Sequence, residues 1–432
     1  MADIAVLLAY MILLTLVYGA IVSEVLPKSV AALLGGIAAI IIGRVAGIFD
    51  VSEIVKFIDM KVLLIIIGIM MFVEVARRSG MFQFIALYIM KFVGYKPRRV
   101  LIILCVLSAM LSAFIGNITA MIIIISVTTL TLIPLGADPI PFLIAISIVL
   151  DLGGTITLIG SPVSILIGYS ANFSYIDFLI YSAPLAMILV LVHILFFLTV
   201  FKKTIPPRFD VDPEILAELD PWMVITDRDL FYRSIAIFIL TVVLFMTYEF
   251  LELSAEFVAL TGGILMLFLG LRASDPKEVF KGIEWEVIFF LLGLFLLMGA
   301  IEKSGLLEVI AEQVVHLTGE NLLLTIILIM GVACVLSAMI DNIPVTLMMI
   351  PIIKTIVTMS GLPATPLWWA LLYGVILGGN LTPIASPTKI IALTVLEREG
   401  YKISFKEFMR YSIPTVLLSM AVAVPYLMKL AG

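Results

Sequence analysis

The chain is poor in the residues that build disulfides, metal centres and basic surfaces. It has only two cysteines, Cys105 and Cys334, and two histidines, His193 and His316, in 432 residues. Both cysteines lie inside apolar runs, and their number excludes a disulfide framework and a zinc site. Lys and Arg number 26 against 31 Asp and Glu, for a formal net charge of −5. The sequence therefore lacks a basic footprint for nucleic acid.

Charged residues are also scarce, and apolar residues dominate. Hydrophobic residues make up 63% of the chain and charged residues 13%, with a mean hydropathy of +1.25. A soluble domain is about half apolar and a quarter charged, so most of this chain must have lipid as its solvent. The N-terminal residues up to Val22 include no Lys or Arg, which favours a first membrane span over a signal peptide. We predict an all-α integral membrane protein.

Apolar runs long enough to cross a bilayer recur along the whole chain. The hydrocarbon core is about 30 Å thick, so a spanning helix needs about 20 apolar residues. By this measure we predict about ten transmembrane helices, near residues 4–23, 28–48, 61–77, 141–169, 178–201, 230–249, 254–271, 286–302, 366–396 and 406–429.

Two further apolar runs, 98–134 and 324–358, are too long for one span. A polar cluster interrupts each run, and the clusters are Gly116-Asn117-Ile118-Thr119 and Asp341-Asn342-Ile343-Pro344. Two apolar arms around a polar tip predict a re-entrant hairpin, which is tolerated where protein or a water-filled cavity satisfies the tip backbone. The alternative is a pair of ordinary spans joined by a tight turn outside the membrane.

The two halves of the chain repeat one pattern in a constant register. The spacing from Asn117 to Asn342, which we call the repeat offset, also relates Gly153-Gly154 to Gly378-Gly379 and Ser161-Pro162 to Ser386-Pro387. Chance similarity between apolar segments does not align Asn, Gly-Gly and Ser-Pro in one register. We infer an internal duplication, with a first repeat at 1–201, a linker at 202–229 and a second repeat at 230–432.

Each repeat holds five spans and one hairpin. Because five is odd, the second copy must be inverted relative to the first, which is the plan of many secondary transporters. The loops rich in Lys and Arg (77–99, 202–208 and 398–410) then share one side, which the positive-inside rule assigns to the cytoplasm. Both termini are expected outside the cell membrane. The acidic residues of the linker are interpreted as a solvated surface: Asp210, Asp212, Glu214, Glu218 and Asp220.

Polar groups at membrane depth are costly, so each one needs an account. Besides the hairpin tips, they gather in two broken spans, 141–169 and 366–396. There the Gly-Gly pair should stop the helix, and Ser-Pro should restart it as N-cap and first helical residue. Carbonyl ends of such breaks suit a cation, and amide ends suit an anion. The predicted ion- or substrate-binding residues are Asn117, Thr119, Asp151, Gly153, Gly154, Thr155, Thr157, Ser161, Ser164, Asp341, Asn342, Gly378, Gly379, Asn380, Thr382, Ser386, Thr388 and Lys389.

The alternative interpretation of these residues is structural, because Gly, Ser and Thr also let kinked helices pack tightly. Three ionisable residues stand out: Asp151 before the first Gly-Gly, Asp341 at the second tip, and Lys389 just past Pro387. A carboxylate in a half-dry site can exchange protons. Both Asp residues are therefore candidates for a proton or cation site, and the Asn117 and Asn342 tips for bound Na⁺, with no other cofactor expected. An ion pair of either Asp with Lys389 is the competing interpretation.

At these residues the chain resembles the ion transporter superfamily. The resemblance is greatest to the branch of arsenite permeases, NhaD-type sodium/proton antiporters and the melanosomal P protein, which have a citrate transporter-like domain. The segments that carry the resemblance are 112–119, 337–346 and 153–162. The family's acid-Pro-Pro-Asn run reads Ser161-Pro162-Val163-Ser164 in this chain, and Gly116 stands where an acidic residue is usual.

The resemblance implies a homodimer whose protomers have a scaffold domain and a mobile transport domain that moves as an elevator. The leading hypothesis is a secondary transporter of a small inorganic or organic ion, coupled to H⁺ or Na⁺. A Na⁺-coupled symporter of citrate or dicarboxylates is the alternative within the superfamily, and an ion channel is the main rival outside it. A membrane enzyme is disfavoured, since the sequence has no Ser-His pairing, phosphate-binding loop or cluster of His, Cys and Asp.

Overall fold

The structure is a computed structural model that describes residues 4–23, 25–93, 96–133, 135–209, 220–270, 276–398 and 400–430. Within these ranges every regular element is a helix, which confirms the predicted all-α fold. In lipid each backbone N–H and C=O must be bonded within its own segment, which is why apolar runs of this length become helices. The acidic residues Asp210, Asp212, Glu214 and Glu218 of the linker lie outside the described residues.

The first half of the chain runs from α1 to α10, and its capping residues follow ordinary rules. Asp59 accepts hydrogen bonds from the amides of Lys61 and Val62 at the start of α3, and Pro97 is the first residue of α5. The elements are α1 (Ile4–Val22), α2 (Lys28–Val45), η1 (Val51–Phe57), α3 (Met60–Arg78), α4 (Met81–Val93), α5 (Pro97–Ile115), α6 (Asn117–Leu132), α7 (Ile140–Gly153), α8 (Pro162–Ala171), α9 (Tyr175–Asp177), η2 (Phe178–Ser182) and α10 (Ala183–Val200).

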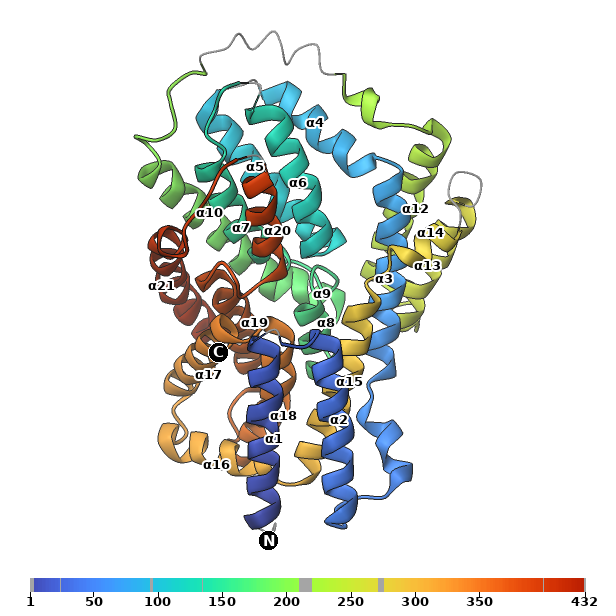
Figure 1. The fold of residues 1–432 in the computed structure, drawn as a ribbon, viewed down its shortest axis with the longest axis vertical. Helices are drawn as coiled ribbons and strands as arrows, with labels where there is room; N and C mark the ends of the chain where they lie inside the picture. The colour runs from blue at the N-terminus through green and yellow to red at the C-terminus, as the bar shows by residue number, and fades with distance from the viewer. Residues whose placement is uncertain are drawn as a thin grey trace.

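The second half begins with η3 (Pro221–Val224), and its helices pair with those of the first half at the same repeat offset. Helices α3, α5 and α6 begin at residues 60, 97 and 117, and α15, α17 and α18 begin at 285, 322 and 342. In Figure 1, α1 lies at the lower end of the molecule and its counterpart α12 at the upper end. The helices are α12 (Arg228–Thr247), α13 (Ala255–Gly270), α14 (Pro276–Lys281), α15 (Trp285–Lys303), α16 (Leu306–Thr318), α17 (Leu322–Met339), α18 (Asn342–Ser360), α19 (Ala364–Leu381), α20 (Pro387–Arg398) and α21 (Phe405–Lys429).

Nine helices in the described ranges are long and apolar enough to cross a membrane. Six of them match predicted spans: α1, α2, the continuous helix 175–200, α12, α15 and α21. The other three, α5, α17 and α18, are arms of the predicted hairpins. Predicted spans 141–169 and 366–396 are each divided into two shorter helices, α13 has only 16 residues, and α3 carries four charged residues. The nine helices therefore differ from the ten predicted spans, because these four predicted spans are too short or too charged to be counted and three hairpin arms are counted instead.

The helices form two groups that pack mainly within themselves. In the first group α2 lies along α15 and α3 along α13, with α1 and α12 beside them. Small residues allow this close approach: a Cβ on Gly293 would lie 2.4 Å from the carbonyl carbon of Ala32, and one on Gly68 2.5 Å from that of Ala259. In the second group α5 packs against α7 and α17 against α19, with α6, α8, α10, α18, α20 and α21 around them. We call these the α2–α15 group and the α5–α19 group.

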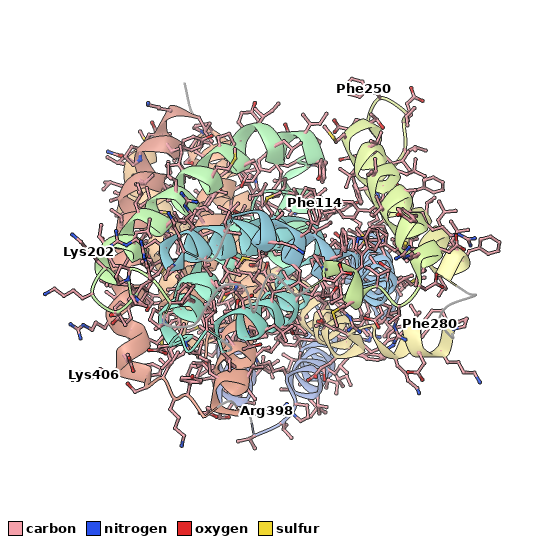
Figure 2. All side chains as sticks on the ribbon, turned by 90° about the horizontal axis from the view of Figure 1, so that it is seen from above. Phe114, Lys202, Phe250, Phe280, Arg398 and Lys406 are labelled. Atoms are coloured by element: carbon pink, nitrogen blue, oxygen red, sulfur yellow. The ribbon has the colours of Figure 1, made fainter. Side chains whose placement is uncertain are left out.

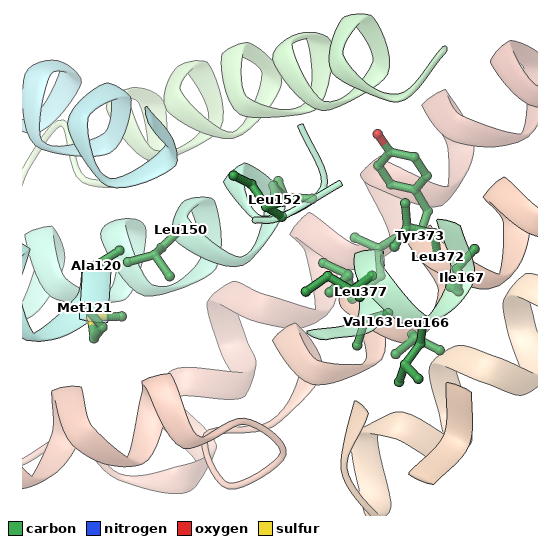
Figure 3. Packing of buried hydrophobic residues seen from close by; sticks show 14 of the residues in the cluster. Ala120, Met121, Leu150, Leu152, Val163, Leu166, Ile167, Leu372, Tyr373 and Leu377 are labelled. Atoms are coloured by element: carbon green, nitrogen blue, oxygen red, sulfur yellow. The ribbon is translucent and has the colours of Figure 1, made fainter. Parts of the chain in front are cut away.

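The core of the α5–α19 group is apolar and aromatic. Figure 3 shows part of it, with Ala120 of α6 near Leu150 of α7, and Val163 of α8 near Leu377 of α19. The Trp369 ring of α19 stacks on Phe173 with centroids 4.6 Å apart. Figure 2 views the molecule from the top of Figure 1, and Lys202 and Lys406 are labelled at its left edge. Dense packing of this kind holds the broken helices in fixed positions beside the hairpin tips.

Candidate functional site

Both hairpin tips have the same local geometry, built on an Asn at the start of the second arm. Asn117 begins α6 after Gly116, whose φ of 78° needs a glycine, and Asn342 begins α18 after Asp341. The Ser112 hydroxyl donates to Asn117 Oδ1 at 2.5 Å. In the second tip the Ser337 hydroxyl donates to Asn342 Oδ1 at 2.6 Å. Each Asn side chain is thus held by the arm that precedes it.

The two broken spans differ in where the first helix ends. Helix α7 ends at Gly153, as expected for a Gly-Gly stop, and α8 restarts at Pro162 with the Ser161 hydroxyl capping the Ser164 amide at 3.1 Å. In the second half the expectation was wrong, because α19 continues through Gly378 and Gly379 to Leu381. Helix α20 then begins at Pro387, as the Ser-Pro signal predicts. The second glycine pair therefore has another role than ending a helix.

That role is close approach to the hairpin. A Cβ on Gly379 would lie 2.5 Å from Asn342 Oδ1, and one on Gly378 would lie 2.3 Å from the carbonyl oxygen of Cys334. The first half repeats both contacts, with Gly154 against Asn117 Oδ1 at 2.4 Å and Gly153 against Ala109. Across each break a threonine hydroxyl ties back to the hairpin: Thr157 donates to the Ala113 carbonyl, and Thr382 to the Ala338 carbonyl at 3.2 Å. Each tip and its neighbouring break are one packed unit.

Both tips and both breaks open onto one cavity of about 910 Å³. The first residues of α6, α8, α18 and α20 all line it, so four helix N-termini converge on the same space. Helix α6 has no side-chain cap, because its N-cap residue is Gly116. The opposite wall is formed by residues 26–28 before and at the start of α2 and by the beginning of α15, including Glu284, Glu286 and Phe290. The cavity thus lies between the two helix groups.

Four charged side chains line this cavity: Lys28, Glu284, Glu286 and Asp341. Lys28 Nζ lies 2.8 Å from Asp341 Oδ2, and the two side chains are 27% and 10% exposed. Glu284 is half-buried, and burial raises the pKa of its carboxyl. Sequence reasoning identified Asp341 but missed Lys28 and Glu284. Glu284 is the counterpart of Asp59 at the repeat offset and directly precedes α15, which is the signal that could have drawn attention to it.

Behind the cavity lies a buried ion pair between the two halves. Lys389 Nζ of α20 is 2.5 Å from Asp151 Oδ2 of α7, and both side chains are completely buried. Asp151 Oδ1 also accepts from Asn117 Nδ2 at 3.1 Å and from the Thr388 hydroxyl at 3.2 Å. The structure therefore pairs Lys389 with Asp151 and not with Asp341. Every one of these partners of the Asp151 carboxylate is a donor, so its charge is already balanced by protein groups.

The remaining predicted residues lie around this centre with different partners. Thr119 lines a smaller pocket of about 110 Å³ beside the first tip. The Thr155 hydroxyl donates to the Leu152 carbonyl, and the Ser164 hydroxyl to the Gly154 carbonyl, so both satisfy the end of α7.

Asn380 is fully buried and donates to the Ile148 carbonyl at 3.1 Å. Ser386 and Thr388 share a hydroxyl contact of 2.7 Å at the start of α20. Among the described residues, no group of three or more His, Cys, Asp and Glu could hold a metal ion.

The two helix groups meet differently in the two halves. Helix α8 packs against α3, whereas its counterpart α20 makes no comparable contact with α15 in the described chain, and the cavity lies there instead. Ile165 of α8 is accordingly 3% exposed, while its counterpart Ile390 of α20 is 37% exposed. The described structure is therefore one-sided: one half is closed and the other is open.

Comparison with known proteins places this fold among membrane transporters. A family model described as a citrate transporter (CitMHS) matches residues 18–374. An uncharacterized transporter of Mycobacterium tuberculosis is 33% identical over 415 residues, which cover 95% of each chain. The 46 kDa membrane protein of Mycobacterium leprae is 33% identical over 423 residues, with the same coverage. The human P protein is 26% identical over 490 residues, which span 95% of this chain and 58% of the P protein.

Two solved structures share the fold at low sequence identity. The YdaH transporter of Alcanivorax borkumensis superposes with a TM-score of 0.59 at 15% identity, over 88% of this chain and 86% of that one. MtrF of Neisseria gonorrhoeae, described as one of a class of antimetabolite efflux pumps, superposes with a TM-score of 0.61 at 11% identity, over 87% and 82%. At these identities the likeness concerns the fold alone.

Proposed function

This chain is a membrane transporter of the citrate transporter (CitMHS) family, and we propose that it moves a small anion by secondary active transport coupled to H⁺ or Na⁺. The observation that carries the proposal is the convergence of four helix N-termini on one cavity of about 910 Å³. Helix N-termini bear partial positive charge and unpaired amides, so they attract anions. The volume falls within the range of about 300–1,000 Å³ that is typical of small-molecule sites.

The proposed binding place for the anion is the first hairpin tip. Helix α6 has no side-chain cap, whereas the α18 amide of Asn342 is capped by Asp341 at 2.6 Å. An acceptor oxygen of the cargo would therefore find uncapped amides at Asn117 and Ile118. The opposite wall of the cavity is unfavourable for an anion because it carries Glu284 and Glu286.

The acidic side of the cavity supports coupling to a cation. A dry or half-dry carboxylate is stabilised by a proton or a metal ion, and its neutralisation lowers the repulsion that an entering anion meets. Asp341 is the residue proposed to bind the coupling ion, with Asn342 beside it as a further oxygen ligand for Na⁺. Asp151 is less suited to this role, because it is completely buried and its partner Lys389 belongs to the same helix group, so movement of the groups leaves their pair intact.

The proposed movement is of the elevator type. Tips, breaks and the Asp151–Lys389 pair belong to the α5–α19 group, and the α2–α15 group forms the opposite wall of the cavity. The α5–α19 group would move as a unit against a static α2–α15 group, which in a homodimer would carry the interface. With the positive-inside orientation and both termini outside, the cavity faces the cytoplasm.

A symporter of citrate or a dicarboxylate with Na⁺ is the second candidate. The family name and the four N-termini favour it, since one carboxylate of a dianion could lie at the first tip and the other at another of these helix starts. Transport of arsenite or exchange of Na⁺ for H⁺ would use the same tips with a smaller cargo.

The function is tested in proteoliposomes loaded and bathed to impose either a Na⁺ or a pH gradient. Uptake of labelled citrate, succinate, sulfate, arsenite and ²²Na⁺ is measured against protein-free liposomes. We expect saturable uptake of one anion that needs one of the two gradients. Uptake of none of them, or a current that does not saturate and exceeds carrier turnover, would overturn the proposal.

A further inference from the structure

The ion pair of Lys28 with Asp341 connects the two helix groups. Lys28 is the first residue of α2, which packs against α15 and α1, whereas Asp341 caps α18 in the α5–α19 group. Their charged atoms are 2.8 Å apart, and both residues line the cavity between the groups. Any sliding of one group against the other must break this pair, because the partners belong to different groups.

The inverted repeat shows what this pair becomes in the opposite state. Alternating access in such folds moves one bundle of helices against the other around the site. We infer the opposite state by giving each repeat the place that the other repeat has now. At the repeat offset, the counterpart of Lys28 is Leu253 and that of Asp341 is Gly116. Neither is charged, so the first half has no equivalent of this ion pair. The contact therefore exists in one of the two states only.

The present surroundings of Gly116 indicate where Asp341 would lie after the exchange. Gly116 shares its pocket with Ile66, Ile69, Met70 and Val73 of α3, and with Glu74 and Glu284. Their counterparts at the repeat offset, which would surround Asp341, are Leu291, Leu294, Phe295, Met298, Gly299 and Asp59. None of these counterparts is basic, and they offer the carboxylate apolar walls and a second carboxylate. Four lysines, Lys56, Lys61, Lys303 and Lys354, line the cavity beside Phe295 and Met298, where Lys303 is paired with Glu53 and Lys61 lies over the Tyr169 ring. A bare carboxylate is costly in such a place.

We propose that Lys28 and the coupling cation take turns at Asp341. In the open state described above, Lys28 neutralises Asp341, and the cation is not needed there. In the opposite state Lys28 is out of reach, and a proton or Na⁺ must neutralise the carboxylate. Lys28 is thus a coupling residue. In the open state its ammonium group displaces the cation from Asp341, so the movement of the α5–α19 group with a bound cation and the movement without one differ in free energy. The inference rests on the proposed coupling to H⁺ or Na⁺, but not on the identity of the cargo.

Other charged groups near Asp341 do not replace Lys28 in this role. Across the cavity it faces Glu284 and Glu286, which have the same sign. Lys389 is fully buried against Asp151. From α1, the Tyr18 hydroxyl donates to the Pro344 carbonyl at 3.1 Å and carries no charge. In the described chain, Lys28 is the basic side chain that pairs with Asp341.

The test follows the open state without using any cargo. Ile390 is 37% exposed in the open half and its counterpart Ile165 is 3% exposed, so a cysteine at 390 should react with a thiol reagent in this state and be protected in the other. The native Cys105 and Cys334 are buried. In purified Ile390→Cys protein, adding Na⁺ or lowering the pH should slow labelling about tenfold, within the range usual for coupled sites. The rate is normalised to Leu317→Cys, which is 74% exposed, to remove the effect of pH on the thiol.

Lys28→Met should abolish this response, because the cation can then neutralise Asp341 in both states. Asp341→Asn should also abolish the response to the cation. This second variant keeps the inference testable if Lys28→Met does not fold. Lys28→Arg, and Lys354→Met at an exposed position near the far end of α18, should keep it. The cation that slows labelling of the parent identifies the coupling ion as H⁺ or Na⁺. A parent that responds to neither cation, or a Lys28→Met variant that responds like the parent, refutes the inference. Absence of anion uptake with an intact labelling response would instead refute the proposed cargo.

Discussion

Lys389 Nζ lies 2.5 Å from Asp151 Oδ2, and neither side chain has any exposed surface. The pair joins α20 of the second half to α7 of the first, and Asn117 of the first hairpin tip donates to the same carboxylate. At the positions related by the repeat, Ser164 and Ile376 carry no charge. The pair is therefore a single asymmetric cross-link at the centre of the α5–α19 group.

Removing one member of this pair should destabilise the protein strongly. Lys389→Met leaves an unpaired buried carboxylate, which typically costs about 3–5 kcal/mol. The double variant Lys389→Met/Asp151→Asn removes both charges and should recover most of the loss. The melting temperature of each variant is measured in detergent, as the temperature at which half of the protein is no longer monodisperse. The control is Lys303→Met, which breaks an exposed pair with Glu53 and should leave the melting temperature unchanged. A double variant as unstable as Lys389→Met would contradict the assignment.

Gly154→Ala should impair binding of the transported ion. The new Cβ would lie 2.4 Å from Asn117 Oδ1 and displace the tip side chain. In enzymes a misplacement of about 1 Å at the reacting centre can cost about a hundredfold in rate. We expect a smaller but clear loss in binding in this site, with a rise of about tenfold in the KM for uptake. Gly379→Ala, against Asn342, should act in the same way. Gly331→Ala is the matched control, because its Cβ would meet nothing within 4 Å. Equal KM values for all three variants would exclude tip displacement.

Anion binding should strengthen as the pH falls, and Glu284 should account for part of this change. Burial raises the pKa of Glu284 above the usual range of a glutamate. The ionised carboxylate repels an anion in the cavity, and the protonated form does not, so affinity rises as the pH falls through this raised pKa. At high pH the affinity of the Glu284→Gln variant for the anion should approach the affinity that the parent protein has at low pH. Isothermal titration of the transported anion across a pH series measures this, with Glu320→Gln, at an exposed position outside the cavity lining, as the control. An unaltered pH profile in Glu284→Gln would show that Glu284 is not involved.

Asp341→Asn should abolish coupled flux while the protein stays folded. The amide cannot take up a proton or balance a Na⁺ charge, but it fits the same space, and its Oδ1 can still accept from the amide of Asn342, as Asp341 does at 2.6 Å. Proteoliposome uptake with and without the driving gradient should become equal, and size-exclusion chromatography should show a normal peak. Uptake that still follows the gradient in this variant would remove Asp341 from the coupling mechanism.

Much of the architecture was predictable from the sequence because it depends on local composition. Apolar runs of about 20 residues must be helical in lipid, whatever they pack against. The Ser-Pro signals also predict where α8 and α20 restart, since capping depends on residues within one turn. The repeat offset, found between Asn117 and Asn342, recurs in the helix boundaries. The second Gly-Gly pair was misinterpreted, because a glycine that ends a helix and a glycine that admits a neighbouring side chain look the same in sequence.

The sequence by itself determined that the chain lies in lipid, that its two halves repeat one plan, and that polar residues cluster at two tips and two breaks. Only the tertiary structure decided which charges meet. Lys389 pairs with Asp151 across 238 residues, and Lys28 with Asp341 across 313. Hydropathy and local motifs contain no information about such distances, because the partners are brought together by packing of helices from opposite halves. The same packing makes the two halves unequal, with α8 closed against α3 and α20 open to the cavity.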